Sequence, residues 1–261
     1  MNSLILLEPE STNLFPTGEA DARKKNAMIS IKNLGRDFVK GDRTITVLDS
    51  VDLSIQEKEF VAVTGPSGSG KSTMLGLLAG LDRPSRGSIE VDGTDITHLS
   101  ENELSKLRGK KMGFIFQSFQ LIPTLTAIEN VRVPAEINGD SEAAKGAEHL
   151  LERVGLSHRM NHYPSQLSGG EMQRVAIARA YITKPRILFA DEPTGNLDTA
   201  NGSMIMEMLM EMNSQCTLVL VTHNAELAAL AAREIRLKDG RIDRIITNRA
   251  KKKSPKTPSK K

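Results

Sequence analysis

Tryptophan is absent from this 261-residue chain, and aromatic residues make up only 3% of it. This scarcity speaks against the interleaved basic and aromatic surface that binds nucleic acid, so we expect no specific nucleic-acid partner. Cysteine occurs once, at Cys216, which excludes an internal disulfide and agrees with a reducing compartment. No apolar run approaches the ~18–20 residues that a membrane-spanning helix requires. We therefore predict a cytoplasmic protein without a membrane-spanning segment.

Charge is distributed unevenly along the chain. The total of +3 combines +7 in residues 249–261, which hold seven Lys and Arg and no acid, with −4 in the remainder. We predict one folded domain, residues 27–247, between a flexible extension, 1–26, and a disordered basic tail, 248–261. The tail is interpreted as a solvated end, and weak attraction to anionic lipid headgroups is its alternative.

Residues 65–73 read GPSGSGKST and fit the pattern G-x-x-x-x-G-K-[ST]. A short β-branched apolar run precedes them at 60–64, and a helical pattern follows at 72–81. Strand, glycine-rich loop and helix N-terminus together predict a phosphate cradle, because backbone N–H groups can point at the phosphates. Lys71 would add a positive charge for the phosphates, and the Ser72 hydroxyl could bind Mg²⁺. A chance Gly/Ser loop is the alternative. The predicted nucleotide-binding residues are Gly65, Pro66, Ser67, Gly68, Ser69, Gly70, Lys71, Ser72 and Thr73.

Apolar and polar residues alternate at 51–55 and 88–92, which predicts a small antiparallel β layer around the strand before the loop. Phe38 lies in this layer. Its ring could stack on an adenine, but the residues alone favour an ordinary core position.

Three further apolar runs each end in polar side chains, which are Gln117, the pair Asp191 and Glu192, and His223. Ligands of parallel sheets bind beyond the carboxyl ends of the strands, so these residues should lie near the phosphate cradle. Asp191 would hold Mg²⁺, and Glu192 would orient and deprotonate the attacking water. The alternatives are an acidic turn before Pro193 and a structural role for His223.

Residues 118–183 have a helical pattern and predict a lobe inserted into the α/β core. Within them, Ser168 and Glu171 fit a capping box, while Gly169 and Gly170 would leave N–H groups open to an anion.

Methionine is frequent between 204 and 212. Positions 204, 205, 208, 209 and 212 form one helical stripe, for which we predict core packing instead of a soft-metal site. An Asp-Gly turn at 239–240 predicts a hairpin after this helix.

Taken in order, six motifs resemble those of the ATP-binding subunit of ABC transporters over about residues 28–246. They are GPSGSGKST, FQ at 116–117, LSGGE at 167–171, RILFADEP at 186–193, GNLD at 195–198 and VTH at 221–223. The stretches FQSFQLIPTLTAIENV, LSGGEMQRVAIARA and DEPTGNLD are most similar to the lipoprotein-releasing and macrolide-export group. The resemblance implies an α/β fold: a P-loop NTPase core with a mostly parallel sheet, an N-terminal antiparallel β layer and an inserted helical subdomain at about 118–183.

The resemblance also implies roles within one chain. ATP and Mg²⁺ would be the ligands of the phosphate cradle. Ser72, Gln117 and Asp191 would ligate the metal ion, Glu192 would be the catalytic base, and His223 would sense the γ-phosphate.

Other implied roles concern the base and a second chain. Phe38 stands where the family has an adenine-stacking aromatic, commonly Tyr. Ser168, Gly169 and Gly170 would contact the ATP held by an opposite copy, and Asp198 would connect the two sites. Two copies would therefore pack head to tail around two ATPs.

The function implied is ATP hydrolysis that energises a separate integral membrane permease with an extracytoplasmic domain. The work would be export, lipoprotein or lipid extraction, or mechanotransmission, by a peripheral protein on the cytoplasmic face of the inner (plasma) membrane. We place the permease contact at residues 118–126. A soluble ABC-type ATPase acting on nucleic acid or the ribosome is the alternative; it would need long coiled-coil insertions or a second such domain. A P-loop kinase or GTPase is disfavoured by the LSGGE motif.

Overall fold

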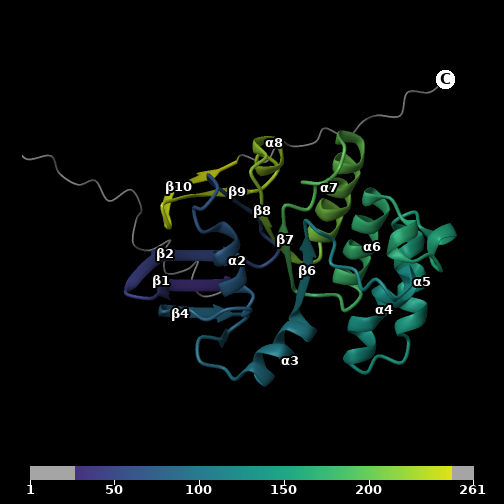
Figure 1. The fold of residues 1–261 in the computed structure, drawn as a ribbon, viewed down its shortest axis with the longest axis horizontal. Coiled ribbons are helices and arrows are strands. Elements are labelled where there is room, and N and C mark those ends of the chain that lie inside the picture. Colours follow the sequence, from purple (N-terminus) through teal and green to yellow (C-terminus); the bar gives the residue numbers. More distant parts are fainter. Residues whose placement is uncertain (1–26, 249–261) are drawn as a thin grey trace, which may run out of the picture.

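The structure is a computed structural model that describes residues 27–248 (Figure 1). Residues 1–26 and 249–261, which include the predicted extension and most of the predicted tail, lie outside the described residues. Asn248, which the composition assigns to the tail, donates from its backbone N–H to Ala232 O at 2.9 Å and from its side chain to Ala231 O at 2.9 Å. The structured chain therefore extends at least one residue past 247.

Four strands form an antiparallel sheet in the order β2-β1-β4-β5, which confirms the predicted N-terminal layer. They are β1 (Ala27–Lys40), β2 (Arg43–Gln56), β4 (Arg86–Val91) and β5 (Thr94–Asp95). Apolar side chains such as Ile29, Leu53 and Ile89 are buried, while polar neighbours alternate with them on the outer face.

A second sheet has the order β10-β9-β3-β8-β7-β6 and is parallel except for β10, as predicted. Its strands are β3 (Phe60–Thr64), β6 (Met112–Phe116), β7 (Ile187–Asp191), β8 (Thr217–Val221), β9 (Arg233–Lys238) and β10 (Arg241–Thr247). β3 and β8 are buried along their whole length, which explains their unbroken apolar sequences. Asp239 and Gly240 both have positive φ and form the predicted hairpin turn between β9 and β10.

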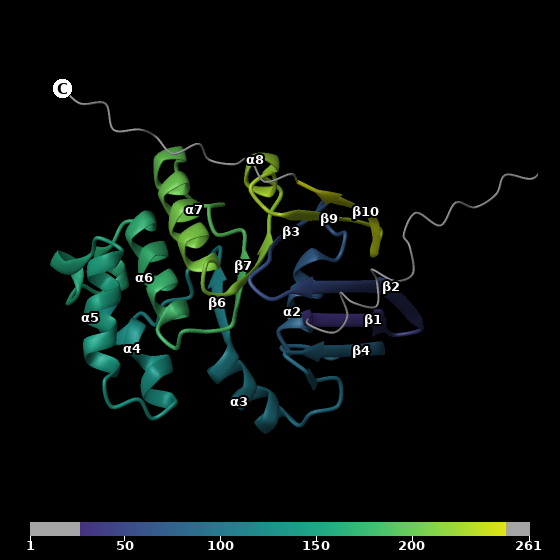
Figure 2. The same ribbon diagram turned by 180° about the vertical axis from the view of Figure 1, so that it is seen from behind.

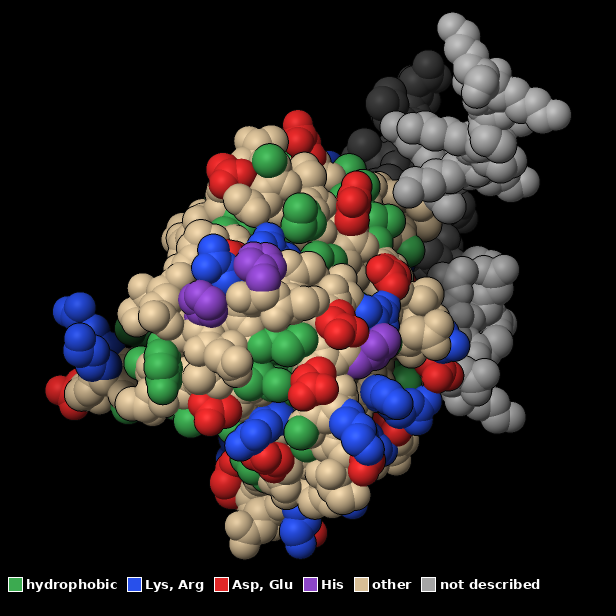
Figure 3. Space-filling view, turned by 90° about the vertical axis from the view of Figure 1, so that its right-hand side faces the viewer, with side chains coloured by type: hydrophobic (Ala, Val, Ile, Leu, Met, Phe, Trp, Pro, Cys, Tyr) green, Lys and Arg blue, Asp and Glu red, His purple; other side chains and the backbone are tan. Residues whose placement is uncertain are grey.

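Helices lie on both sides of the parallel sheet, and three of them form a lobe beside it (Figures 1 and 2). The lobe contains α4 (Ala127–Ile137), α5 (Ala143–Arg153) and α6 (Gly169–Tyr181), together with the short turns η1 (Ser157–Arg159) and η2 (Pro164–Gln166). The other helices are α2 (Lys71–Leu78), α3 (Glu101–Lys111), α7 (Thr199–Asn213) and α8 (Ala225–Ala228). On the face of the lobe shown in Figure 3, acidic and basic side chains are interspersed around a small apolar group.

Three apolar clusters hold these layers together. One joins the antiparallel sheet and α2 to one face of the parallel sheet, a second packs the other face against α6 and α7, and a third fills the helical lobe. Phe189 of β7 is fully buried and its ring stacks on Phe114 at 5.6 Å between centroids. The strand ends that carry the predicted site residues therefore project from a rigid sheet.

Core packing of α7 is confirmed, but the buried face differs from the predicted stripe. Ile205, Leu209 and Met212 are buried, whereas Met204 is 44% exposed and Met206 is 3% exposed. Methionines lie on both sides of the stripe, so periodicity alone could not tell which flank meets the sheet.

Candidate active site

The phosphate loop connects β3 to α2 through backbone conformations that favour glycine. Gly65, Gly68 and Gly70 have φ values of 144°, 79° and 97°. A Cβ atom on Gly65 would lie 2.2 Å from the carbonyl oxygen of Leu237, while one on Gly68 would meet nothing within 4 Å. Gly65 is therefore required by close packing against β9, and Gly68 by the turn itself.

Several polar groups of this loop are open to an anion. No described side chain caps the N-terminus of α2, and its first turn contains no acid. The backbone N–H groups at this positive end of the helix are therefore free to bind an anion. The Ser69 hydroxyl is buried without a hydrogen-bond partner among the described residues. Lys71 Nζ donates to the carbonyl oxygens of Gly65 at 3.0 Å and Pro66 at 2.9 Å, which holds its charge over the loop. These groups fit a polyphosphate.

Asp191 ends β7 next to this loop, and the structure brings it together with Ser72. Burial raises the pKa of Asp191, and a hydrogen bond with Ser72 opposes this effect. Glu192 also raises that pKa, and Lys71 lowers it. A half-buried carboxylate beside a hydroxyl is a pair of oxygen ligands that suits Mg²⁺, so the residues fit this ion.

Glu192 is turned back toward the end of β8 by an unusual backbone conformation, with φ at 46°. One carboxylate oxygen accepts from the backbone N–H of His223 at 2.8 Å and lies 2.7 Å from His223 Nδ1. The other accepts from the Thr222 hydroxyl at 3.1 Å. The carboxylate is only 15% exposed, whereas the imidazole is 73% exposed. Glu192 is thus held firmly, whereas most of the His223 imidazole is open to solvent.

Gln117 follows β6 at the same sheet edge, because Phe116 is the register partner of Asp191. Its side-chain amide donates to Asn196 Oδ1 at 3.2 Å, and Asn196 donates back to Gln117 O at 3.0 Å. The loop after β7 therefore holds Gln117. Asn196 was missed by the sequence reasoning, although it lies inside the GNLD motif.

The chain beyond Gln117 contains two consecutive residues in the left-handed region, Phe119 and Gln120, with φ values of 60° and 48°. Arg179 of α6 donates to the carbonyl oxygens of both residues, at 2.9 Å for Phe119. Burial lowers the pKa of Arg179. This arginine was also missed, and its only sequence signal is a charge among the small apolar residues of α6.

Ser168 forms the predicted capping box at the start of α6. Its hydroxyl accepts from Glu171 N at 3.3 Å, and its own N–H donates to the Glu171 carboxylate at 2.8 Å. Gly169 is half-buried, and Gly170 is buried where a Cβ atom would lie 2.6 Å from Asn201 Oδ1. α6 packs on β6, three strands from β3, which corresponds to a lateral distance of ~14 Å between strand axes. This segment and the phosphate loop are therefore separate within one chain.

Asp198 caps α7 by accepting from the backbone N–H of Asn201 at 2.9 Å, and this hydrogen bond lowers the pKa of the carboxyl.

Phe38 is 41% exposed, so the interpretation of Phe38 as a core residue is wrong. The reason is its place near the outer end of the β1–β2 hairpin, where the facing residue Ile45 is also exposed.

The family known as ABC transporter matches residues 48–195, which is more than half of the chain. This protein belongs to the ABC transporter ATP-binding family. It is 44% identical to the lipoprotein-releasing system ATP-binding protein LolD of Shewanella frigidimarina over 84% of this chain and 93% of that protein. It is 45% identical to the macrolide export ATP-binding/permease protein MacB of Bdellovibrio bacteriovorus over 82% of this chain and 33% of that protein.

Among solved structures, the fold matches a dimeric post-hydrolysis state of the ATP-binding cassette MJ0796 bound to ADP and Pi. The TM-score is 0.80 and the identity 43%, over 85% of this chain and 99% of that one. Membership of the family confirms the predicted ATPase activity, the ligands ATP and Mg²⁺, and the place of this chain as a transporter's ATP-binding subunit. The alternative of an ATPase acting on nucleic acid or the ribosome gains no support. Within residues 27–248, no helix has the length and hydropathy needed to span a bilayer.

Proposed function

We propose that this ABC ATPase works as a head-to-tail dimer that energises a separate integral membrane permease with an extracytoplasmic domain. It would lie on the cytoplasmic face of the inner membrane and drive export, lipoprotein or lipid extraction, or mechanotransmission. The observation that carries the dimer is the separation of the phosphate loop from the Ser168 segment across four strands of one sheet. A second copy can place its own Ser168 segment against the nucleotide of the first.

Within each site, the chain's own residues would divide the work. The N-terminus of α2 and Lys71 bind the phosphates, and Ser72 and Asp191 hold Mg²⁺, with Gln117 reaching them from the end of β6. The ion would neutralise phosphate charge during transfer. Glu192 is positioned to accept the proton of the attacking water, because its carboxylate is fixed by Thr222 and His223.

A dimeric cassette has precedent in MJ0796, which is 43% identical to this chain. In such an arrangement Ser168, Gly169 and Gly170 would contact the phosphates held by the partner copy, since they lie at an N-terminal helix end. Asp198 would lie between the two sites, on the same loop as Asn196. Binding of ATP would bring the copies together, and hydrolysis would release them.

Two relatives illustrate how an ATP-binding part and a permease can be connected. The macrolide export relative is named as an ATP-binding/permease protein, and this chain covers only 33% of it. The lipoprotein-releasing relative, in contrast, is matched over 93% of its length and is named as the ATP-binding protein of a system. We propose for this chain the arrangement that the name of the second relative suggests, with the permease on another polypeptide of the system.

A groove of about 540 Å³ beside β6, the strand that leads to Gln117, is a suitable docking site for a cytoplasmic segment of the permease. It lies between the core elements α3 and β6 and the lobe helices α4 and α6, and Arg179 and Gln120 contribute to its lining. Two of its apolar side chains are strongly exposed, Leu81 at 53% and Ile137 at 79%. The groove includes only Gln120 from the predicted contact segment 118–126, so we extend that contact to α3 and the end of α4.

The test is purification of the tagged protein from detergent-solubilised membranes, with ATPase activity measured on the product. We expect an integral membrane protein to co-purify and to change the ATPase rate. Ile137→Asp should abolish this association, whereas Leu230→Asp, a charge placed at another exposed apolar residue, should preserve it. A protein that elutes active and alone would contradict the proposed permease. An Ile137→Asp variant that keeps its membrane partner would contradict the proposed docking site.

A further inference from the structure

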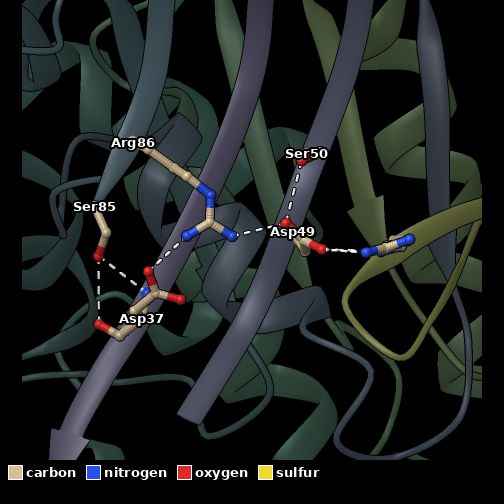
Figure 4. Close-up of polar contacts among 6 residues, drawn as sticks. Asp37, Asp49, Ser50, Ser85 and Arg86 are labelled. Carbon is tan, nitrogen blue, oxygen red and sulfur yellow. Dashed lines mark hydrogen bonds and ion pairs between the residues drawn. The ribbon is translucent and has the colours of Figure 1, made fainter. Parts of the chain in front are cut away.

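The edge of β1 that carries Phe38 is tied to the loop after α2 by several polar contacts (Figure 4). Gly35 O accepts from Ser85 N at 2.8 Å, and the backbone N–H of Asp37 donates to the Ser85 hydroxyl at 3.0 Å. Arg86 binds the Asp37 carboxylate at 2.6 Å. The backbone on the N-terminal side of Phe38 is therefore held to this loop at Gly35 and at Asp37.

Arg86 extends this attachment across the sheet. Its second guanidinium nitrogen binds Asp49 of β2 at 2.7 Å, and Asp49 also binds Arg241 of β10. Hydrogen bonding with these arginines, led by Arg86, lowers the pKa of Asp49 to about 2, so the carboxylate stays ionised at neutral pH. The Arg86 side chain lies flat against Gly35, where a Cβ atom would be 2.5 Å from its Nε.

Arg36 completes the surroundings of the Phe38 ring. Its guanidinium carbon lies over the ring, 4.5 Å from the centroid. The same group binds Asp82 at 2.9 Å and is 22% exposed, so it is held in place from behind. Asp82 lies four residues after the end of α2, the helix that begins at the phosphate loop. With the guanidinium in position, Phe38 still has 41% of its surface exposed.

We propose that Arg36 is a positioning residue for the nucleotide base: it covers one face of the Phe38 ring and leaves the other face for adenine. The inference rests on the proposed adenine-stacking role of Phe38. A phenylalanine has no hydroxyl to anchor it, so an exposed ring loses rotamer freedom when a base stacks on it. The cation on the first face holds the ring before the base arrives, because the ring face attracts the guanidinium.

The connection through Asp82 gives this arrangement a second consequence. Through Arg36 and Asp82, the Phe38 ring is connected to the C-terminal end of α2. The phosphates would bind at the N-terminal end of the same helix. The Arg36–Asp82 ion pair thus adds a link from the ring to α2 beyond the backbone contacts of Gly35 and Asp37 with Ser85. Arg36 should therefore affect binding of a nucleotide but leave binding of its phosphate portion unchanged.

The experiment measures dissociation constants of the full chain for ATP–Mg²⁺ and for inorganic tripolyphosphate with Mg²⁺, which has no base. We expect Arg36→Met to weaken ATP binding about three- to tenfold and to leave tripolyphosphate binding within about twofold. Arg43→Met, which removes an exposed arginine of the same hairpin, should change neither. In a Phe38→Leu background, Arg36→Met should have no further effect on ATP binding, and thermal unfolding confirms that each variant is folded.

The possible results separate the inference from the stacking role on which it depends. Tighter ATP binding by Arg36→Met would mean that the guanidinium occupies the face needed by the base, which overturns the inference. Equal weakening of both ligands would overturn it too, because Arg36 would then only support the fold. A loss of ATP preference in Phe38→Leu but not in Arg36→Met refutes the inference alone. An unchanged preference in Phe38→Leu refutes the stacking role, and the inference with it.

Discussion

Replacement of Glu192 by glutamine should remove the proposed catalytic base while preserving the local structure. The native carboxylate accepts from the His223 backbone N–H at 2.8 Å and from the Thr222 hydroxyl at 3.1 Å. In Glu192→Gln the amide oxygen can keep the His223 contact, and the amide nitrogen can donate to the Thr222 oxygen. One hydrogen bond is thus reversed in direction and none is lost.

These contacts allow the magnitudes to be separated. The free energy of unfolding should change by less than about 1 kcal/mol, the worth of a single hydrogen bond. A positioned general base contributes ~10²–10⁴-fold to a rate, so turnover should fall by that factor, equivalent to about 3–5 kcal/mol in the activation barrier. ATP affinity should remain within about threefold, because the phosphate loop and Lys71 are untouched.

The assay combines steady-state ATP hydrolysis with size-exclusion chromatography in saturating ATP–Mg²⁺. We expect Glu192→Gln to elute as a dimer and the parent chain to return to monomer as ATP is consumed. Thr222→Val, which removes only the supporting hydroxyl, should give a smaller loss of turnover. Turnover of Glu192→Gln within tenfold of the parent would refute the assignment of Glu192 as the base, and a monomer in saturating ATP–Mg²⁺ would refute the ATP-dependent dimer.

Three other predictions follow from the site. Burial raises the pKa of Asp191 in the folded state, so the charged carboxylate destabilises the fold above that pKa. In EDTA, Asp191→Asn should therefore raise the thermal unfolding midpoint at pH 7. This gain should shrink when the pH falls below the usual Asp pKa of ~4, and a gain that stays constant would contradict burial as the cause. Ser168→Ala should cost about 1 kcal/mol in chemical unfolding and weaken the ATP-dependent dimer, whereas Thr126→Ala, which removes the matching cap of α4, should cost as much and leave the dimer intact. Arg179→Met should lower turnover about ten- to a hundredfold with little change in ATP affinity, because it releases the loop after Gln117; an equal loss of affinity would place Arg179 in ATP binding instead.

Local rules determined much of this protein from the sequence. The phosphate loop can be predicted from its glycines, because positions with φ of 79° or 97° exclude most other residues. The capping box of α6 needs only Ser168 and Glu171, which are neighbours on one helical turn. Parallel strands that are buried on both faces must be apolar throughout, so β3, β7 and β8 were visible, and with them the polar residues at their ends.

Tertiary structure decided what depends on partners far apart in the chain. α3 has a polar sequence with one buried residue, Leu104, and gave no periodic signal. The buried flank of α7 and the exposure of Phe38 follow from how these elements meet their neighbours. The hold of Arg179 on the loop after Gln117 joins residues about 60 positions apart.

The ion pairs of Arg86 behave in the same way, because they bring together β1, β2 and β4 with Asp49 as the shared link to β10. Spacing along the chain determines which backbone conformations and periodic faces are possible. It does not determine which distant charge or apolar surface will stand opposite a side chain, since that depends on strand order and register. The residues of the candidate site could therefore be predicted from short motifs, whereas the contacts that hold them in position required the assembled fold.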